Sequence, residues 1–305
     1  MRAISFSEYG GPEVLREVDV DSPEPRADQV RVQVRAAGVN PFDCKLRAGA
    51  FAGQIRLRLP HVPGAEVAGL LEAVGRDVAG TQVGDPVFGW AKSGGRLRRA
   101  ATLSTFADVP AGLSWVDAAA LPVAGEAANR ALETLGLRAG ETLLVHGAAG
   151  AVGTIAVQLA LRAGATVVGT AGPSNQEDLT ALGVTATVYG DGLLDRVRQL
   201  APQGVDAVLD IAGKGALPAS IELRGGTDRV VTLADPAASS LGVAFLAGTD
   251  SGQTAQLLAM LAGAVRAGQL ALPTPRTFGL AAAADAHTLS ERGTGRGKIV
   301  LDLTP

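Results

Sequence analysis

One stretch in the middle of the chain limits the possible folds more than any other. Thr142–His146 is a short strand-like run, TLLVH, and it leads directly into the sequence GAAGAVG at residues 147–153. Residues 151–163 then repeat apolar side chains every three or four positions, as a helix does. A buried strand, a glycine-rich turn and a helix in this order begin a βαβ unit, which requires a parallel sheet. The chain is therefore predicted to contain an α/β domain.

The small residues of this turn are spaced as in dinucleotide-binding proteins. Ala148 permits the tight turn, the missing Cβ of Gly150 lets the backbone approach a pyrophosphate, and Gly153 lets the helix pack close to the sheet. The free N–H groups at the start of the helix, at Ala151 and Val152, then face the phosphates. We expect these five residues to bind a dinucleotide cofactor; a purely structural glycine turn is the alternative.

The end of the next predicted strand indicates which nicotinamide cofactor is used. That strand ends at Thr170, and Gly172, Ser174 and Asn175 follow it with no carboxylate before Glu177. A carboxylate here would bond the ribose 2′-hydroxyl of NADH and repel the 2′-phosphate of NADPH. Its absence favours NADPH (NADP+), with Thr170, Gly172, Ser174 and Asn175 lining the site. The same residues also suit an ordinary Gly-Pro turn with a serine N-cap.

The rest of the chain divides into three parts by its patterns. Short strands and turns fill residues 1–117, strands alternate with helices over residues 118–272, and an extended segment, a helix and a strand occupy residues 273–305. We predict a β domain, a parallel-sheet domain covered by helices on both faces, and a tail that folds back onto the first domain. The predicted helices are residues 118–135, 151–163, 176–182, 193–200, 254–267 and 281–291, and the predicted strands include residues 30–36, 142–146, 166–170, 186–189, 205–211, 229–234, 242–247 and 298–303.

Composition and charge exclude several classes of protein. The formal net charge is −3 and no segment carries a dense run of Lys or Arg, so neither nucleic acid nor a membrane surface is an expected partner. No apolar run reaches the ~18 residues of a transmembrane helix, and residues 1–6 lack the apolar core of a signal peptide. The single cysteine, Cys44, excludes an intrachain disulfide and a multi-cysteine zinc site. These features predict a cytoplasmic protein.

Six motifs together resemble the medium-chain dehydrogenase/reductase superfamily, in its zinc-independent quinone oxidoreductase branch. They are EYGGPEVL at residues 8–15, AGVNPFD at 37–43, PGAEVAG at 63–69, VGDPVFG at 83–89, HGAAGAVG at 146–153 and RGKIVL at 296–301. The resemblance covers essentially the whole chain. It implies an α/β protein with a GroES-like β domain and a Rossmann domain, the latter a doubly wound parallel sheet. It also implies a small-molecule substrate in the interdomain cleft, and a homodimer that pairs through a strand near residues 242–247.

The same resemblance separates the chain from zinc-dependent alcohol dehydrogenases. Where those enzymes have a cysteine ligand this chain has Asn40, where they have a histidine ligand it has Ala65, and Glu66 is retained. Their four-cysteine lobe is missing. A catalytic zinc needs three protein ligands from imidazole, thiolate or carboxylate groups. Asn40 and Ala65 supply none of these, so no metal is expected.

Without zinc, a quinone or a conjugated enone is easier to reduce than a simple carbonyl, because the charge that develops on hydride addition spreads to an oxygen. The predicted activity is therefore NADPH-dependent reduction of a quinone or an α,β-unsaturated carbonyl. The resemblance implies that Asn40 and Asp43 line the cleft, where Asn40 donates its amide to the substrate oxygen and Asp43 orients neighbouring groups. Lys45 replaces a proton-relay histidine, with an exposed surface charge as the alternative. Tyr189 matches a position that contacts the adenosine phosphate, with packing on the sheet as the alternative.

Two departures leave the proton donor open. Many relatives have a tyrosine where this chain has Phe51 and a threonine where it has Ala127, so two hydroxyls are missing from the expected site. The histidines do not replace them: His146 is expected to support the glycine turn, and neither His61 nor His287 has a partner visible in the sequence.

Two alternative functions stay open. An enoyl-thioester reductase of a polyketide or fatty-acyl pathway would share this fold and need a basic mouth, for which Arg96, Arg98 and Arg99 are candidates. An NADPH-binding protein with a non-redox role would also explain the missing hydroxyls. The short-chain dehydrogenases are excluded, because neither tyrosine is followed four residues later by lysine.

Overall fold

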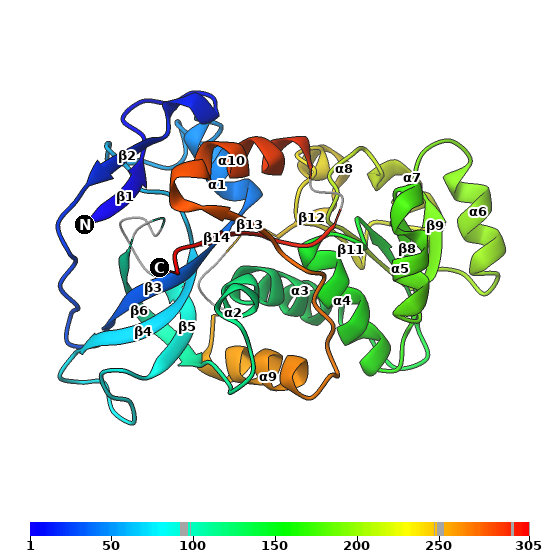
Figure 1. The fold of residues 1–305 in the computed structure, drawn as a ribbon. Helices are drawn as coiled ribbons and strands as arrows, with labels where there is room; N and C mark the ends of the chain where they lie inside the picture. The colour runs from blue at the N-terminus through cyan, green and yellow to red at the C-terminus, as the bar shows by residue number, and fades with distance from the viewer. Residues whose placement is uncertain (92–96, 98, 247, 249–252, 294–295, 305) are drawn as a thin grey trace.

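Two six-stranded sheets carry most of the described chain, which is the sequence without residues 92–96, 98, 247, 249–252, 294–295 and 305. The structure is a computed structural model. In Figure 1 one sheet lies at the left, near both ends of the chain, and the other at the right, with helices between and around them. None of the helices in the described residues is long and apolar enough to cross a lipid bilayer.

The first sheet is antiparallel except at one edge, and it has the strand order β13-β14-β3-β4-β5-β6. Strand β6 also pairs with β3, so β3 to β6 close on themselves. Along β3 the buried side chains alternate with half-buried ones from Val30 to Arg35, which confirms the predicted alternation. The strands are β3 (Val30–Val39), β4 (Glu66–Val74), β5 (Pro86–Ala91), β6 (Ala100–Asp108), β13 (Arg276–Gly279) and β14 (Ile299–Asp302); a separate hairpin pairs β1 (Arg2–Ser5) with β2 (Arg16–Asp19).

The second sheet is parallel and has the order β12-β11-β10-β7-β8-β9. The strand order reverses between β7 and β10, as in a doubly wound α/β sheet, and ligands bind such sheets at the carboxyl ends of these strands. This confirms the fold class predicted from the glycine turn. The strands are β7 (Thr142–His146), β8 (Thr166–Ala171), β9 (Thr185–Val188), β10 (Ala207–Asp210), β11 (Val230–Thr232) and β12 (Ala244–Phe245).

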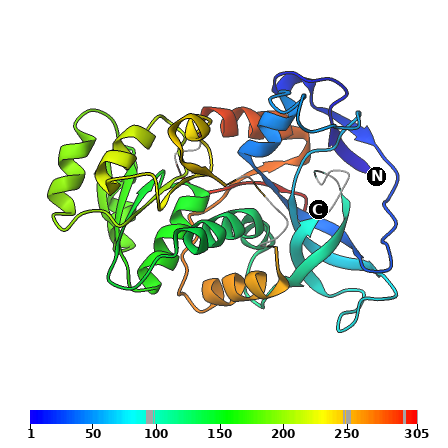
Figure 2. The ribbon, with the colours of Figure 1, turned by 180° about the vertical axis from the view of Figure 1, so that it is seen from behind.

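Helices cover both faces of the parallel sheet, because its central strands are apolar on both sides. Leu143 and Leu209 pack with α3 and α4, whereas Leu144 and Val208 pack with α6 and α7. Figure 2 shows α3 and α9 together on one side of the molecule. The helices are α1 (Pro41–Arg47), α2 (Trp115–Ala120), α3 (Pro122–Leu135), α4 (Ala151–Arg162), α5 (Gln176–Ala181), α6 (Leu193–Leu200), α7 (Leu217–Arg224), α8 (Ala238–Leu241), α9 (Ala255–Arg266) and α10 (Ala283–Arg292).

The structure differs from the sequence prediction in several elements. The single helix predicted over residues 118–135 is wrong: α2 ends at Ala120 and α3 begins at Pro122, because proline has no N–H to donate within a helix and suits its first turn. Helices α1, α7 and α8 were not predicted. The strand predicted at residues 242–247 is only β12, and Ala247 lies outside the described residues.

The C-terminal segment links the two sheets. Strand β14 pairs antiparallel with β3, and just before it Gly297 forms a parallel bridge with Gly150 of the glycine turn. Arg296 forms an ion pair of 2.5 Å with Asp178 at the start of α5. In Figure 1 this segment, in red, runs between the two parts of the molecule. The predicted domain limits after residues 117 and 272 stay predictions.

Helices α1 and α10 meet through polar side chains, most of which are buried. Cys44 Sγ lies 3.4 Å from His287 Nδ1, and the fully buried Arg47 pairs with Glu291. Nε2 of His287 has no hydrogen-bond partner among the described residues. Burial lowers the pKa of His287 to about 4, and the nearby Arg47 guanidinium acts in the same direction. The imidazole is therefore neutral at pH 7.

We expect this histidine to make the fold acid-sensitive. Its pKa is lower in the folded protein than the ordinary value of 6.5, so the stability it contributes is complete above about pH 6.5 and is lost as pH falls toward 4. By pH 5 the loss is about 2 kcal/mol. His287→Leu, compared with the unmodified protein by urea unfolding at pH 7 and pH 5, should lose correspondingly less stability. An equal fall in both proteins would contradict the expectation, and measurements between pH 7 and 8 serve as the control.

Candidate active site

The glycine turn lies at the carboxyl end of β7, at the point where the strand order reverses. The backbone N–H groups of Gly147 and Ala148 both donate to the Thr170 carbonyl of β8, at 3.2 and 3.0 Å, and hold the turn to the sheet. Gly147 has a φ of +81°, which glycine adopts without strain. A Cβ on Gly153 would lie 2.2 Å from the Gly147 carbonyl oxygen, so only glycine fits there.

The turn has the features that a dinucleotide pyrophosphate requires. Gly150 is the residue before α4, and a Cβ placed on it would meet, among the described atoms, only the Gly147 carbonyl oxygen, at 3.5 Å. The backbone at this point is therefore open to a ligand. Ala151 and Val152 begin α4, where the first N–H groups of a helix have no partner within the helix. The residues predicted to hold the pyrophosphate thus fit it, and Ala148 lies fully buried beneath them.

The segment after β8 carries neutral hydrogen-bonding groups. The Tyr189 hydroxyl lies 3.7 Å, and Nδ2 of Asn175 4.0 Å, from the place that a Cβ on Gly172 would take. The structure thus brings Tyr189, Asn175 and Gly172 together, although they come from two segments of the chain. Ser174 is exposed beside them. Tyr189 is 64% exposed, so it does not pack on the sheet as the alternative interpretation required.

The Thr170 hydroxyl, at the end of β8, lies against a histidine of the adjacent strand. Its Oγ1 lies 3.2 Å from His146 Nδ1, and His146 Nε2 lies 3.0 Å from Ser220 Oγ. All three side chains are buried. Burial lowers the pKa of His146 to about 4, against a smaller opposing effect of Asp210. The His146 imidazole is therefore neutral at pH 7. Together with Thr170 and Ser220 it lies under the glycine turn, which is the position predicted for His146.

A second group of polar side chains surrounds the start of α1, and Asn40 is its centre. Asn40 Nδ2 donates to Glu66 Oε1 at 3.0 Å, and the Lys298 ammonium donates to Asn40 Oδ1. Lys298 Nζ also lies 2.6 Å from Glu66 Oε1, and Glu66 Oε2 accepts from the N–H of Val123 at 2.7 Å. Asn40, Glu66 and Lys298 are 5%, 0% and 7% exposed. We refer to these three residues as the amide cluster.

Asp43 fixes the backbone around this cluster. Its two carboxylate oxygens accept the N–H of Asn40 at 2.9 Å and the N–H of Gly64 at 3.1 Å. Burial raises the pKa of Asp43, while the Asn40 N–H and the Lys298 charge act against that increase. Both oxygens accept from the backbone, which suits the orienting role predicted for this residue.

The other residues considered in the sequence analysis lie outside the glycine turn and the amide cluster. Lys45 is exposed. The rings of Phe51 and Phe42 lie 5.3 Å apart, and Phe42 is 48% exposed on α1. Ala127 is half-buried on α3. Of the basic residues considered for a thioester substrate, Arg96 and Arg98 lie outside the described residues and Arg99 is half-buried.

Two residues of the amide cluster were not identified from the sequence as site residues. Glu66 and Lys298 are charged residues within otherwise apolar strand segments, AEVAG and GKIV, and such residues need a buried partner. That signal could have marked both of them. The contact of Glu66 with Asn40 depends on the pairing of β4 with β3, and that of Lys298 depends on the pairing of β14 with β3, which no local pattern indicates.

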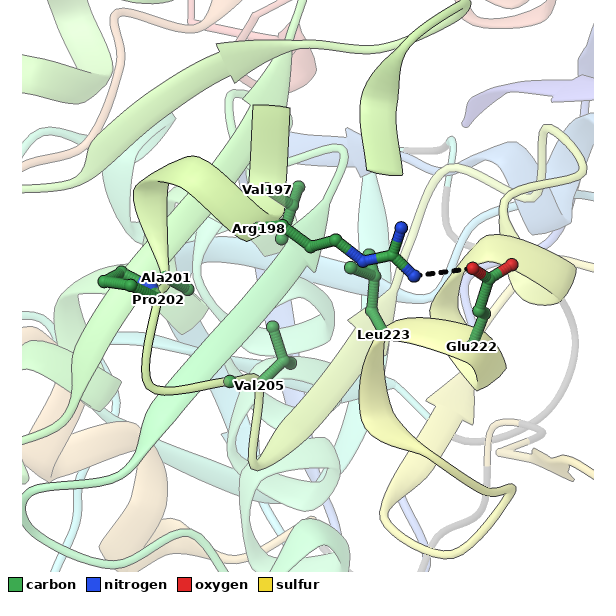
Figure 3. A pocket seen from close by; sticks show the side chains of 8 residues that line it. Val197, Arg198, Ala201, Pro202, Val205, Glu222 and Leu223 are labelled. Atoms are coloured by element: carbon green, nitrogen blue, oxygen red, sulfur yellow. Dashed lines mark hydrogen bonds and ion pairs between the residues drawn. The ribbon is translucent and has the colours of Figure 1, made fainter. Parts of the chain in front are cut away.

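Two cavities of the described structure lie outside the space between Gly150 and Asn40. One of about 230 Å³ lies between α6 and α7, and Figure 3 shows its lining with Arg198 and Glu222 paired at 2.6 Å. It adjoins Val205, before the amino end of β10, and therefore faces away from the ligand-binding edge of the sheet. A second, of about 170 Å³, lies behind the glycine turn between Ala149 and Arg296. Neither is lined by Asn40 or Gly150.

No group of three or more His, Cys, Asp or Glu side chains that could hold a metal ion occurs among the described residues. At the places that correspond to zinc ligands in related enzymes, the chain has the Asn40 amide and Ala65. The retained Glu66 carboxylate is already bonded to an ammonium group.

Two family models match the chain. The model described as an alcohol dehydrogenase GroES-like domain matches residues 26–112, and that described as a zinc-binding dehydrogenase matches residues 182–301. The first match agrees with the predicted GroES-like domain. Residues 26–112 contain β3 to β6, the strands that close on themselves.

Three known proteins illustrate what the chain is similar to. It is 33% identical to a quinone oxidoreductase of Mus musculus over 99% of this chain and 97% of the mouse protein. It is 32% identical to a 2-methylene-furan-3-one reductase of Solanum lycopersicum over 100% of this chain and 80% of that protein. The solved structure of the quinone oxidoreductase from Coxiella burnetii matches with a TM-score of 0.88 and 31% identity, over 100% of this chain and 99% of that one.

Proposed function

The chain belongs to the medium-chain dehydrogenase/reductase superfamily, in its quinone oxidoreductase branch, and we propose that it is a reductase that uses NADPH to reduce a quinone or an α,β-unsaturated carbonyl without zinc. Membership of this family makes the protein an NAD(P)H-dependent oxidoreductase. The relatives named as a quinone oxidoreductase and as a 2-methylene-furan-3-one reductase support the two substrate classes.

One observation carries the proposal. The bridge between Gly150 and Gly297 puts the glycine turn next to Lys298, and therefore next to the amide cluster. A cofactor bound at the turn and a substrate bound at Asn40 would thus be neighbours. Because these groups come from different domains, the arrangement is one that brings two ligands together.

The cofactor would be held by the glycine turn and the segment after β8. Ala148, Gly150, Ala151, Val152 and Gly153 supply the small turn and the N–H groups for the pyrophosphate. When bound, NADPH supplies the hydride for the reaction.

Selection of NADPH over NADH would rest on neutral groups near the ribose. The Tyr189 hydroxyl, the Asn175 amide and the exposed Ser174 hydroxyl can each donate to a 2′-phosphate, and no carboxylate between Thr170 and Glu177 repels it. Gly172 allows the ribose to approach. Thr170 would contribute its carbonyl, which holds the turn, rather than its buried hydroxyl.

Zinc independence is supported by the chemistry of the amide cluster. At the two positions where zinc enzymes have a cysteine and a histidine ligand, this chain has an asparagine amide and an alanine, which has no ligand atom. A metal would also have to displace Lys298 from Glu66. The ammonium already supplies the positive charge there. Asn40 would donate an N–H to the substrate oxygen, and Asp43 would keep the backbone of Asn40 in place.

The outer part of the site would receive the body of the substrate. Phe42 and Phe51 form a half-exposed aromatic pair at the start of α1 and just after it, and such a pair suits a flat quinone ring. Lys45 is exposed on the same helix and is free to relay a proton through solvent. We further propose that the protein is a homodimer that pairs through the exposed edge strand β12, where Phe245 is 48% exposed.

NADPH oxidation with a benzoquinone, a naphthoquinone, an alkenal, an enone and an enoyl thioester tests this proposal. We expect turnover with a quinone or an enone, a preference for NADPH over NADH of about 10-fold, as one or two neutral hydrogen bonds to the phosphate would give, and no effect of a chelator. A best rate with the thioester would favour the alternative enoyl-thioester reductase. Tight NADPH binding without turnover would support a non-redox role, and loss of activity in chelator would contradict zinc independence.

A further inference from the structure

We propose that Lys298 is a positioning residue of this site: its ammonium fixes the side-chain amide of Asn40 so that one Nδ2–H is directed to the substrate oxygen. The proposal rests on the function proposed above, because it names the residue that makes Asn40 an effective donor. Lys298 lies 258 positions after Asn40 in the sequence, and the C-terminal segment before β14 brings it to the site.

The orientation of the Asn40 amide follows from its two neighbours. An ammonium group can only donate, so the atom that faces Lys298 must be the oxygen. The Glu66 carboxylate, which takes part in an ion pair, accepts, so the atom that faces it must be the nitrogen. Neither contact would survive a rotation of the amide by half a turn. The cluster therefore allows one orientation of Asn40.

This orientation leaves one donor available. The amide nitrogen carries two hydrogens, and one of them is used by Glu66 Oε1 at 3.0 Å. The second has no hydrogen-bond partner among the described residues. A buried N–H without a partner is costly unless a ligand or water accepts from it. A ketone or quinone oxygen, and above all the oxyanion formed on reduction, is an acceptor of the required kind.

Lys298 is itself held firmly. Its side chain is 7% exposed and pairs with a carboxylate that is completely buried. That carboxylate also accepts the N–H of Val123 in the first turn of α3, where a negative charge is stabilised by the helix dipole. The backbone on either side of Lys298 is fixed as well, because Gly297 bridges to Gly150 and Ile299 pairs with Val39.

The backbone of Asn40 does not depend on Lys298. Asp43 accepts the Asn40 N–H and also the Gly64 N–H, so two hydrogen bonds that do not involve Lys298 hold the backbone around Asn40. Removal of the ammonium should therefore leave the backbone of α1 in place and release the rotation of the amide, while the Glu66 carboxylate loses its counter-charge. Once the Asn40 amide can rotate, its oxygen faces the substrate oxygen part of the time. Two hydrogen-bond acceptors then face each other, and they repel.

The experiment compares Lys298→Met with Lys298→Arg, using a quinone that the unmodified enzyme reduces. For Lys298→Met we expect kcat to fall about 10- to 100-fold, with KM for the quinone changed less than 3-fold, as for loss of one oriented donor to an oxyanion. Lys298→Arg, which keeps a donor-only cation, should recover part of this loss. Arg266→Met, which removes an exposed charge from α9, is the matched control and should leave kcat unchanged.

A double-mutant cycle with Asn40→Ala shows whether Lys298 acts through Asn40. If it does, Lys298→Met changes kcat less than about 2-fold once the amide is absent. An unchanged kcat in Lys298→Met, or a full additional loss in the Asn40→Ala background, would overturn the proposal. Absence of quinone or enone turnover in the unmodified enzyme would instead refute the proposed function.

A measurement on the unmodified protein covers the case in which Lys298→Met does not fold. The chain has only three asparagines, Asn40, Asn129 and Asn175, so selective ¹⁵N labelling gives three side-chain amide pairs in an NMR spectrum. The proposal requires that the two Nδ2 hydrogens of Asn40, assigned with Asn40→Ala, exchange with solvent at rates that differ at least 10-fold. It also requires that a non-reducible quinone analogue shift the faster one. Equal exchange rates would overturn it.

Discussion

Substitution of Gly153 by valine is expected to leave little folded protein. A Cβ at this position would lie 2.2 Å from the Gly147 carbonyl oxygen and 2.7 Å from two backbone atoms of Ala148. These atoms belong to the turn that the N–H groups of Gly147 and Ala148 hold against β8 by donating to the Thr170 carbonyl. They cannot move without breaking these two hydrogen bonds. We expect a loss of at least ~3 kcal/mol in the free energy of unfolding, measured by urea unfolding and by soluble yield.

Two other glycines provide controls for this experiment. Gly263 lies in α9, where an added Cβ would meet no described atom within 4 Å outside the backbone of its own helix, so Gly263→Val should unfold within about 1 kcal/mol of the unmodified protein. Gly150→Ala meets only one oxygen at 3.5 Å and should fold, but it should bind NADPH at least 10-fold more weakly because the methyl group fills the approach to the pyrophosphate. A Gly153→Val protein as stable as Gly263→Val would show that the turn tolerates a side chain.

The second large effect is expected at Glu66. Glu66→Gln keeps the shape of the side chain but leaves the buried ammonium of Lys298 without a counter-charge. Loss of one partner of a buried ion pair costs about 3–5 kcal/mol, because the remaining charge is desolvated and unpaired. The free energy of unfolding at pH 7 should fall by that amount, and kcat should fall with it because Lys298, once its ion pair is lost, no longer holds the Asn40 amide in one orientation.

A surface carboxylate in the same strand serves as the matched control. Glu72 lies in β4, six residues along, and pairs with Arg31 at 3.3 Å with its side chain 34% exposed. Glu72→Gln should cost less than about 1 kcal/mol, as exposed ion pairs do. Combining Glu66→Gln with Lys298→Met should restore part of the lost stability, because no buried charge then remains unpaired. Equal effects of Glu66→Gln and Glu72→Gln would contradict the importance assigned to the buried pair.

The elements that the sequence predicted best are those with local causes. The limits of β7 and α6 are the predicted ones, and the glycine turn has the predicted position between β7 and α4. In each case apolar spacing and turn residues within about ten positions determine the structure. The helix at residues 118–135 was predicted less well, because the break before Pro122 was not taken as a helix boundary.

The candidate site was predicted only in part, since its chemistry depends on contacts between distant segments. The turn residues were identified because all of their causes lie within one βαβ unit. Asn40 was identified by resemblance, but its neighbours Glu66 and Lys298 were not, because 26 and 258 positions separate them from it. The buried direction of the Thr170 hydroxyl was missed because it follows from His146 on the adjacent strand.

The position of β14 has a consequence for how the chain folds during synthesis. The strands of the parallel sheet lie between residues 142 and 245, so that domain can form while later residues are still being added. The first sheet cannot be completed in that order, although β3 to β6 leave the ribosome early, because β3 pairs with residues 299–302 and these pair in turn with β13. Until those residues emerge, one edge of β3 and the apolar surface covered by Ile299 and Leu301 stay open to other chains. The part of the protein made first is therefore the last to be finished, and this is where a nascent chain most needs protection from aggregation.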